Sequence, residues 1–236
     1  MKIKMIGTGS MISSDNPACY LINDRVLIDL PNGVVKILKK ENCFENITDI
    51  FITHIHGDHI FDLPFIFLDR FKNNKQLNVY IDRKWFNKIK QLVKLAFPRE
   101  YYNIFYNSQI KFLDNKLNYN IDNLMICRKL MNHGHMKPSY GYLLSENNKK
   151  VLFTGDTCLC NNLINILPYI DAVICDCTMI QGNNKHIGVD NIIRILSDYP
   201  KLKVIPSHMG INAKKSLKKL KQKNLNVKND LDELIL

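Results

Sequence analysis

Three of the seven histidines and one carboxylate lie within six positions, at His54, His56, Asp58 and His59. Histidine nitrogens and carboxylate oxygens are both good ligands for zinc and related divalent cations. In a tight loop, the first two of these residues can face one side while the last two face another. Without a metal, four such side chains packed this closely would repel one another. The pattern therefore favours two adjacent cations over a solvated, histidine-rich loop.

Two divalent cations about 3.5–4 Å apart can share one hydroxide, lower its pKa and hold an ester oxygen. Negative charge that develops on that oxygen during hydrolysis then meets positive charge. The sequence therefore predicts a metal-dependent hydrolase. A cysteine nucleophile is unnecessary in such an enzyme, because the hydroxide already supplies the attacking group.

The elements around this cluster favour an α+β fold, because strand-rich halves carry interspersed helices. Short runs of branched residues between turn-forming residues predict strands. These are Lys2–Ile6, Cys19–Ile22, Val26–Asp29, Ile50–Thr53, Leu124–Leu130, Ser139–Leu144, Val151–Phe153, Ala172–Cys175 and Val204–Pro206. Apolar residues at helical spacing predict helices at Gly33–Lys40, Trp85–Ala96, Val189–Leu196 and Ala213–Lys221. We expect two sheets with the helices outside them.

The composition is that of an ordinary globular chain, with 236 residues of which 46% are hydrophobic and 23% charged. No repeat or Pro/Gly-rich boundary divides it, so we expect one domain over residues 1–236. The most apolar stretch, Ile60–Leu68, is interrupted by Asp62 and Pro64 and is too short to span a membrane. The first ten residues lack the apolar run of a signal peptide. These features predict a cytoplasmic protein with reduced cysteines. The sequence allows a homodimer without specifying one.

The net charge of +11 suits an anionic partner such as a phosphate ester or a nucleic acid. Scattered lysines in a chain rich in Lys, Asn and Ile explain the same charge without a partner. The basic run Lys214–Lys223 is either a solvated helix face or a phosphate contact. The pairs Cys158-x-Cys160 and Cys175-x-Cys177 are expected to be small buried hydrophobes rather than a second metal site.

The run from His54 to His59 resembles the H-x-H-x-D-H signature of the metallo-β-lactamase fold, and the likeness extends over most of the chain. Ile6–Gly9 is similar to the glycine turn that opens many members. Thr154–Thr157, which reads Thr-Gly-Asp-Thr, looks like the fourth motif of the fold, and Pro206–His208 looks like the segment that carries its last histidine ligand. The resemblance implies a four-layer αββα sandwich.

Within this fold, the chain is most similar to the tRNase Z-like phosphodiesterase branch. Thr53–Pro64 resembles the first signature of that branch, and His135–Tyr142 resembles its third motif, in which a histidine is followed by Pro and then Gly-Tyr. Asp176 and His186 stand where the branch has a paired acidic residue and histidine, although a glutamate is more usual at the first position. The resemblance implies a phosphodiesterase.

The resemblance also implies two divalent ions, zinc first, with Mn²⁺ or Fe²⁺ as alternatives. The implied ligands are His54, His56 and His135 for one ion, Asp58, His59 and His208 for the other, and Asp156 as a bridge between them. His133 competes with His135, and the spacing of the Pro and Gly-Tyr residues favours His135. For His208, the alternative is a buried histidine that is bonded to the backbone.

Three residues are candidates for proton transfer. His186 would protonate the leaving group, with Asp176 orienting it through the other ring nitrogen. Asp58 would double as a base, as the resemblance suggests. The alternatives are a surface histidine at a helix start for His186 and an ordinary turn or strand-end cap for Asp176.

The tRNA-cutting members of this branch carry a long arm between the Gly-Tyr and Gly-Asp-Thr motifs. Here only Leu143–Gly155 separate Tyr142 from Asp156, which is enough for a turn between two strands. We therefore expect a small or nucleotide phosphodiester as substrate, and RNA is not favoured. The alternatives are a tRNase Z-type endoribonuclease acting on RNA 3′ ends, a hydrolase of lactones or other carboxylic esters, and a non-catalytic binding module.

Overall fold

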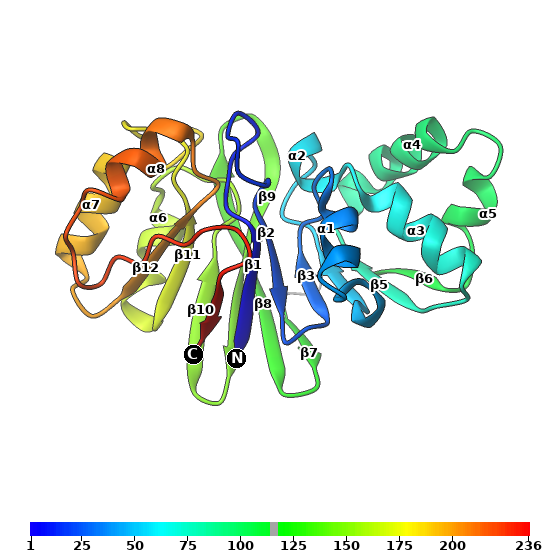
Figure 1. Cartoon of the computed structure of the whole chain (residues 1–236), viewed down its shortest axis with the longest axis horizontal. Helices are drawn as coiled ribbons and strands as arrows, with labels where there is room; N and C mark the ends of the chain where they lie inside the picture. The colour runs from blue at the N-terminus through cyan, green and yellow to red at the C-terminus, as the bar shows by residue number, and fades with distance from the viewer. Residues whose placement is uncertain (114–117) are drawn as a thin grey trace.

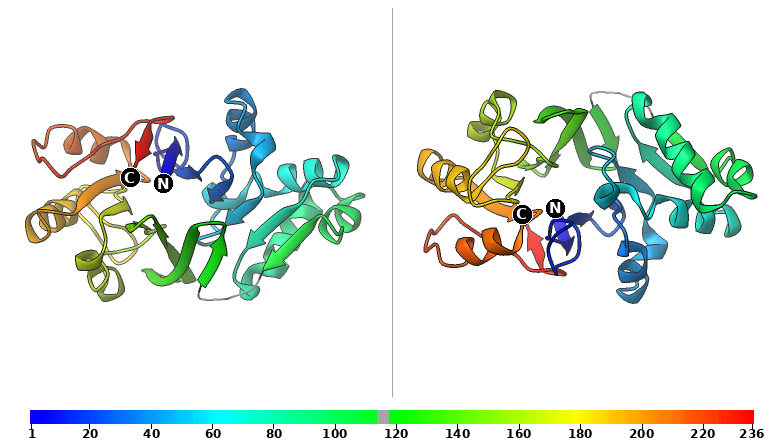
Figure 2. Two further views of the ribbon diagram at one scale, coloured as in Figure 1. Left: turned by 90° about the horizontal axis from the view of Figure 1, so that it is seen from below. Right: turned by 90° about the horizontal axis from the view of Figure 1, so that it is seen from above.

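The computed structural model describes residues 1–113 and 118–236, in which two mixed sheets lie face to face. Figure 1 shows the sheets in the middle of the molecule, with α1, α3, α4 and α5 on one flank and α6, α7 and α8 on the other. The views from below and above show the same layers and place the two chain ends side by side (Figure 2). The expected αββα sandwich is therefore confirmed.

The first sheet has the strand order β13-β1-β2-β3-β4-β5-β6. Its strands are β1 (Lys2–Gly7), β2 (Cys19–Ile22), β3 (Val26–Ile28), β4 (Asp49–Phe51), β5 (Leu77–Tyr80), β6 (Ile110–Leu113) and β13 (Glu233–Ile235). The strands from β13 to β3 pair antiparallel, and those from β3 to β6 pair parallel. The C-terminal strand β13 closes the edge beside β1, which brings the two chain ends together.

The second sheet has the strand order β12-β11-β10-β9-β8-β7. Its strands are β7 (Asn118–Ile121), β8 (Leu124–His133), β9 (Met136–Glu146), β10 (Lys149–Phe153), β11 (Ala172–Asp176) and β12 (Lys203–Ser207). The strands β7 to β10 form an antiparallel meander, whereas β10, β11 and β12 are parallel. The carboxyl ends of parallel strands meet at one edge of a sheet, so the loops after β10, β11 and β12 lie together.

The helices cover the outer face of each sheet. Beside the first sheet are α1 (Val34–Lys40), α2 (Gly57–Ile60), α3 (Leu63–Lys72), α4 (Phe86–Ala96) and α5 (Tyr101–Phe105). Beside the second sheet are α6 (Asn161–Ile164), α7 (Val189–Asp198) and α8 (Ile211–Leu217). Short 3₁₀ turns lie at Phe44–Asn46, Arg83–Trp85 and Leu167–Tyr169. None of the helices in the two described ranges combines the length and the apolar character that crossing a membrane requires.

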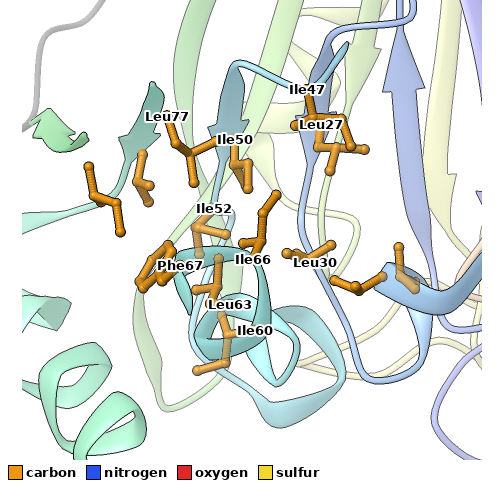
Figure 3. Close-up of a cluster of buried hydrophobic side chains, with 14 of the residues drawn as sticks. Leu27, Leu30, Ile47, Ile50, Ile52, Ile60, Leu63, Ile66, Phe67 and Leu77 are labelled. Carbon is orange, nitrogen blue, oxygen red and sulfur yellow. The ribbon is translucent and has the colours of Figure 1, made fainter. Parts of the chain in front are cut away.

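Three apolar layers hold the sheets and helices together. The outer layer of the first sheet packs Ile50 of β4, and Ile52 just after that strand, against Ile66 and Phe67 of α3 (Figure 3). A second layer fills the space between the two sheets, and a third lies between the second sheet and α7. The buried residues of α7 recur at helical spacing, at Val189, Ile192, Ile195 and Leu196. This stripe is what fixes the face that α7 turns toward the sheet.

Most of the predicted elements are present with small changes in their bounds. The predicted helix Ala213–Lys221 instead spans Ile211–Leu217, because the chain turns at Lys218 and the lysines beyond it make no apolar stripe. Strands β5, β6, β7 and β13 were not predicted. All four are short, and β7 carries a polar Asn-Tyr-Asn run, so the strand conformation of β7 comes from its pairing with β8 rather than from its own residues.

Replacing Phe153 by alanine should destabilise the fold by about 3–5 kcal/mol, the usual cost of removing a buried phenyl ring. Phe153 belongs to β10, is fully buried, and lies 5.0 Å from the ring of Tyr20 in the opposite sheet. Denaturant unfolding followed by circular dichroism measures the change. The exposed Leu130 is a control, since its replacement by alanine should cost about 0.5 kcal/mol or less. Equal losses in the two variants would contradict this account of the core.

Candidate metal centre

The first group of candidate ligands joins the loop after β4 to the ends of β8 and β10. Nitrogens of His54, His56 and His133 and an oxygen of Asp156 lie within 4.8 Å of one another. The Nε2 atom of His54 is 2.9 Å from Nδ1 of His56, and Nε2 of His133 is 3.2 Å from the same atom. Three imidazole nitrogens and a carboxylate oxygen thus converge on one point. This set of donors is typical of a zinc-type site.

The structure shows that the prediction of His135 in this group is wrong. His133 is buried at the end of β8, and its Nδ1 donates to the Lys185 carbonyl at 2.9 Å, which leaves Nε2 free for the site. His135 is exposed in the tight turn to β9, where Gly134 has a φ of 58°. Strand β8 has to end before this turn, so the side chain directed toward the site is the one that precedes the glycine.

The second group contains Asp58 and His59 from α2 and His208 from the end of β12. One atom from each lies within 4.8 Å of the others, and Nε2 of His208 is 3.2 Å from Oδ2 of Asp58. The Nδ1 atom of His59 is turned the other way, 2.7 Å from Oδ2 of Asp29. Its Nε2 therefore faces the second group. Three ligand-type side chains from two distant parts of the chain meet here as predicted.

Asp156 lies between the two groups and presents one oxygen to each. Its Oδ2 is 3.9 Å from Nε2 of His54 and 3.8 Å from Nε2 of His133. Its Oδ1 is 3.5 Å from Nε2 of His59 and 3.6 Å from Nδ1 of His208. This two-sided placement is the geometry that a bridging carboxylate requires, and the bridging role of Asp156 itself stays a prediction.

The glycine before the bridge is required by its surroundings. Gly155 has a φ of 58°, and a Cβ atom there would lie 2.8 Å from the Tyr140 carbonyl oxygen and 3.0 Å from the Thr53 side chain. Any other residue would be strained in backbone and in contact. Gly155 therefore allows the carboxylate to sit against the loop that carries the first histidines.

Two buried polar atoms show that the residues fit divalent cations. Nε2 of His59 and Oδ1 of Asp156 are both buried and have no hydrogen-bond partner. Buried polar atoms nearly always have partners, so unpaired ones need an explanation such as an ion. Both atoms are metal-ligand types and both face the centre. The divalent-metal binding that the fold implies is consistent with them.

Burial and charge set the protonation of the ligands. Burial lowers the pKa of His54 well below its ordinary value and also lowers the pKa of His56 and His133, so these rings are neutral. Burial would raise the pKa of Asp156, but the neighbouring His208 and other histidines hold it well below the usual range. Neutral imidazole and ionised carboxylate are the forms that bind metal. Burial would lower the pKa of His59 and of His208, but neighbouring carboxylates raise it, so these two rings have to release a proton when they bind a metal.

The candidate acid and its carboxylate also lie at this centre. Nδ1 of His186 is 2.8 Å from Oδ2 of Asp176, whose side chain is fully buried. His186 lies in the loop before α7, three residues ahead of the helix, and faces Asp176 rather than solvent. Burial lowers the pKa of His186, but the hydrogen bond and charge of Asp176 outweigh it and raise that pKa above its ordinary value. Asp176 therefore favours the protonated form of this ring.

Sequence reasoning missed residues that form hydrogen bonds to the candidate ligands on the side away from the centre. Asp29 accepts from the backbone and the hydroxyl of Thr53, both at 2.8 Å, in addition to its contact with His59. The position of Asp29 directly after the apolar run Val26–Ile28 could have indicated this role, because a carboxylate at the end of a buried strand needs a partner. Thr178, which contacts both Asp176 and His208, carried no such signal.

The two cysteine pairs take no part in the groups of ligands found in the described residues. Cys158, Cys175 and Cys177 are buried, and Cys160 is half-buried. Burial raises the pKa of Cys158, Cys175 and Cys177, so these thiols stay protonated and behave as small hydrophobes.

The sequence pattern of the family described as "Anti-Pycsar protein Apyc1" matches residues 1–230. The chain belongs to this family. The match includes every candidate ligand described above and all strands of the two sheets except β13. The predicted relationship to the tRNase Z-like branch of the metallo-β-lactamase fold is also confirmed by relatives and by structural neighbours.

Curated relatives carry the name ribonuclease Z. The one from Macrococcus caseolyticus is 24% identical over 86% of this chain and 83% of its own length. The one from Picrophilus torridus is 30% identical over 61% of this chain. That match covers about half of the length of the relative, 48%. Among solved structures, the metallo-β-lactamase fold protein YhfI from Bacillus subtilis is similar with a TM-score of 0.76 and 16% identity, over 99% of this chain and 98% of its own. The chain is thus a hydrolase of this fold with a divalent-metal site.

His133→Ala should lower the metal content of the protein, whereas His135→Ala should leave it unchanged. The first substitution removes a buried nitrogen from the group around His56, and the second removes an exposed ring. Elemental analysis after gel filtration in metal-free buffer measures both. If His133→Ala kept its metal and His135→Ala lost it, the ligand would be His135, as the motif spacing predicted.

Proposed function

We propose that this chain is a phosphodiesterase that cleaves small phosphodiesters, including nucleotides. It would use two divalent cations, for which zinc is the favoured metal. One observation carries the proposal: Asp156 lies between two groups of ligand-type side chains, and the His186–Asp176 pair stands beside them. A pair of cations held this way, when bound, supplies a hydrolytic nucleophile at neutral pH and a counter-charge for ester oxygens. The chain itself must then position protons and exclude wrong substrates.

Two side chains are suited to proton transfer. Asp58 is buried, and its carboxylate lies at the second ligand group, 3.2 Å from His208, where it can accept a proton from the attacking water. Asp176 raises the pKa of His186 and so favours its protonated form, and the Nε2 atom of His186 is left free since Nδ1 is bonded to Asp176. It is therefore suited to protonate the departing alkoxide.

The substrate proposal depends on a short turn. Strand β9 ends at Glu146 and β10 begins at Lys149, so only Asn147 and Asn148 connect them, both with positive φ. This is the place where tRNA-cutting members that the chain resembles carry their arm. Two asparagines in a tight turn leave no room for such an arm between β9 and β10. We therefore favour small diesters.

A ribonuclease acting on RNA 3′ ends is the second candidate. It is favoured by the relative from Macrococcus caseolyticus, whose name is ribonuclease Z and whose match extends over 83% of its length. The net charge of +11 would support weak contact with RNA. Such contact through scattered lysines would fall steeply as salt rises.

A substrate panel tests the proposal. Metal-loaded protein should hydrolyse bis(p-nitrophenyl) phosphate and cyclic nucleotides, and should act much more slowly on p-nitrophenyl phosphate, on lactones and on a pre-tRNA. A diester carries one negative charge and a leaving group that His186 can protonate. A monoester dianion would bind the cations tightly in its ground state, which does not raise the rate. Salt-resistant cleavage of pre-tRNA at its 3′ side would favour the ribonuclease, and lactone hydrolysis without diester activity would exclude a phosphodiesterase.

His186→Ala should retain its metals but cleave alkyl phosphodiesters about 10²–10⁴ times more slowly, the range for lost general acid–base help. The loss should shrink for a nitrophenyl diester, because nitrophenolate leaves without a proton. Rates for both substrates and the metal content are measured in parallel, with His135→Ala as a control histidine that is exposed. Equal losses for the two leaving groups would assign His186 to phosphate binding instead.

A further inference from the structure

The Asp176 carboxylate has all of its acceptor positions in use. Its Oδ2 accepts from Nδ1 of His186 at 2.8 Å and from the Thr157 backbone at 3.2 Å. Its Oδ1 accepts from the Thr178 backbone at 3.1 Å and from the Thr178 hydroxyl at 2.7 Å. The side chain is fully buried. A buried carboxylate held by four donors cannot rotate, so the groups bonded to it are fixed as well.

The Thr178 hydroxyl also contacts a candidate metal ligand, since its Oγ1 lies 2.8 Å from Nδ1 of His208. A hydroxyl has one proton to donate and lone pairs that accept. Two acceptors compete for that proton, Oδ1 of Asp176 at 2.7 Å and the His208 carbonyl at 3.0 Å. The carboxylate is closer and charged, and charge-assisted bonds are stronger. The hydroxyl therefore donates to Asp176 and accepts from Nδ1–H of His208.

This direction of the bonds decides which nitrogen of His208 can bind a metal. A proton on Nδ1 leaves the lone pair of a neutral ring on Nε2, and Nε2 is the atom that lies 3.2 Å from Oδ2 of Asp58. The His208 backbone has a φ of 49°, which is the left-handed region that a residue with a Cβ atom seldom adopts. Contacts that hold such a residue are needed, and Thr178 touches both its ring and its carbonyl.

We propose that Thr178 is a positioning residue that fixes His208 as an Nε2 ligand and joins it, through Asp176, to His186. The hydrogen bonds run from His208 to Thr178 and from Thr178 to Asp176, and His186 donates to the other oxygen of the same carboxylate. The metal ligand and the proton donor are thus oriented by one buried anion. Only the link to His186 rests on the proposed function, because the orientation of His208 concerns metal binding alone.

Two substitutions separate the hydroxyl from the rest of the side chain. Thr178→Val keeps the shape and removes the hydroxyl, whereas Thr178→Ser keeps the hydroxyl. The matched control is Thr48→Val, since the Thr48 hydroxyl also donates to a carboxylate, Oδ2 of Asp49 at 2.6 Å, at the start of β4 and outside the candidate ligand groups. Circular dichroism establishes that each variant is folded.

Metal affinity and the visible spectrum of the cobalt-substituted protein are the readouts. Thr178→Val should bind one of its metals about 10–100-fold more weakly, the usual effect of losing a group that orients a ligand. Its cobalt spectrum should change, while Thr178→Ser and Thr48→Val should resemble the parent protein. Unchanged affinity and spectrum in Thr178→Val would overturn the proposal. So would an equal loss in Thr178→Ser, because the methyl group rather than the hydroxyl would then be responsible.

A measurement on the unmodified protein keeps the proposal testable even if Thr178→Val does not fold. Nitrogen-15 NMR of the zinc-loaded protein should show His208 protonated at Nδ1 and bound to metal through Nε2, with the signal assigned from its absence in His208→Gln. The opposite tautomer would refute the inference. Metal readouts that behave as expected in a protein without diester activity would reject the proposed function and leave the role of Thr178 intact.

Discussion

The arrangement of the site depends on one buried negative charge, the carboxylate of Asp156. The Asp156 carboxylate is almost fully inaccessible to solvent, and one of its oxygens has no hydrogen-bond partner. Burying such an anion is costly unless positive charge lies next to it. Histidine rings face both oxygens, and Asp156 helps to raise the pKa of His208 to about 10 even though burial alone would lower it. The buried carboxylate therefore favours positive charge at the centre, whether from a protonated histidine or from a divalent cation.

Each sheet contributes a second carboxylate behind the ligands. In the first sheet, Asp29 follows β3 and holds His59 through its Nδ1. In the second sheet, Asp176 ends β11 and holds His186 directly. Both carboxylates are buried, and both also accept bonds from backbone N–H groups, of Thr53 and Thr157 respectively. The centre is therefore oriented from both sides, and it depends on the sheets keeping their spacing.

That spacing comes from the apolar layer between the sheets and from a few polar contacts across it. The hydroxyl of Tyr142 donates to the Ile52 carbonyl at 2.7 Å, just before the first histidines, and the hydroxyl of Tyr20 donates to Ser207, next to His208. These bonds attach the ligand-bearing loops to the opposite sheet. Packing in the middle of the molecule therefore controls the distances between ligands at its edge.

From the sequence alone, a metal-dependent hydrolase and the class of fold were predictable. The H-x-H-x-D-H motif lies within one short loop, so its spacing can be recognised in the sequence without knowledge of the fold. The regular strands were also predictable where their own residues were branched and apolar, as in Val26–Ile28. Short polar strands such as Asn118–Ile121 were not, because only their pairing with a neighbour makes them strands.

Only the tertiary structure decided between His133 and His135. The two residues are equivalent as ligand types and stand two apart, so the choice depends on where β8 ends and on which side of Gly134 faces the other sheet. The same holds for Asp29 and Thr178, whose functions consist of contacts with residues that lie 30 positions away in the chain. Sequence shows which groups can bind a metal, whereas the packing of the two sheets determines which of them meet.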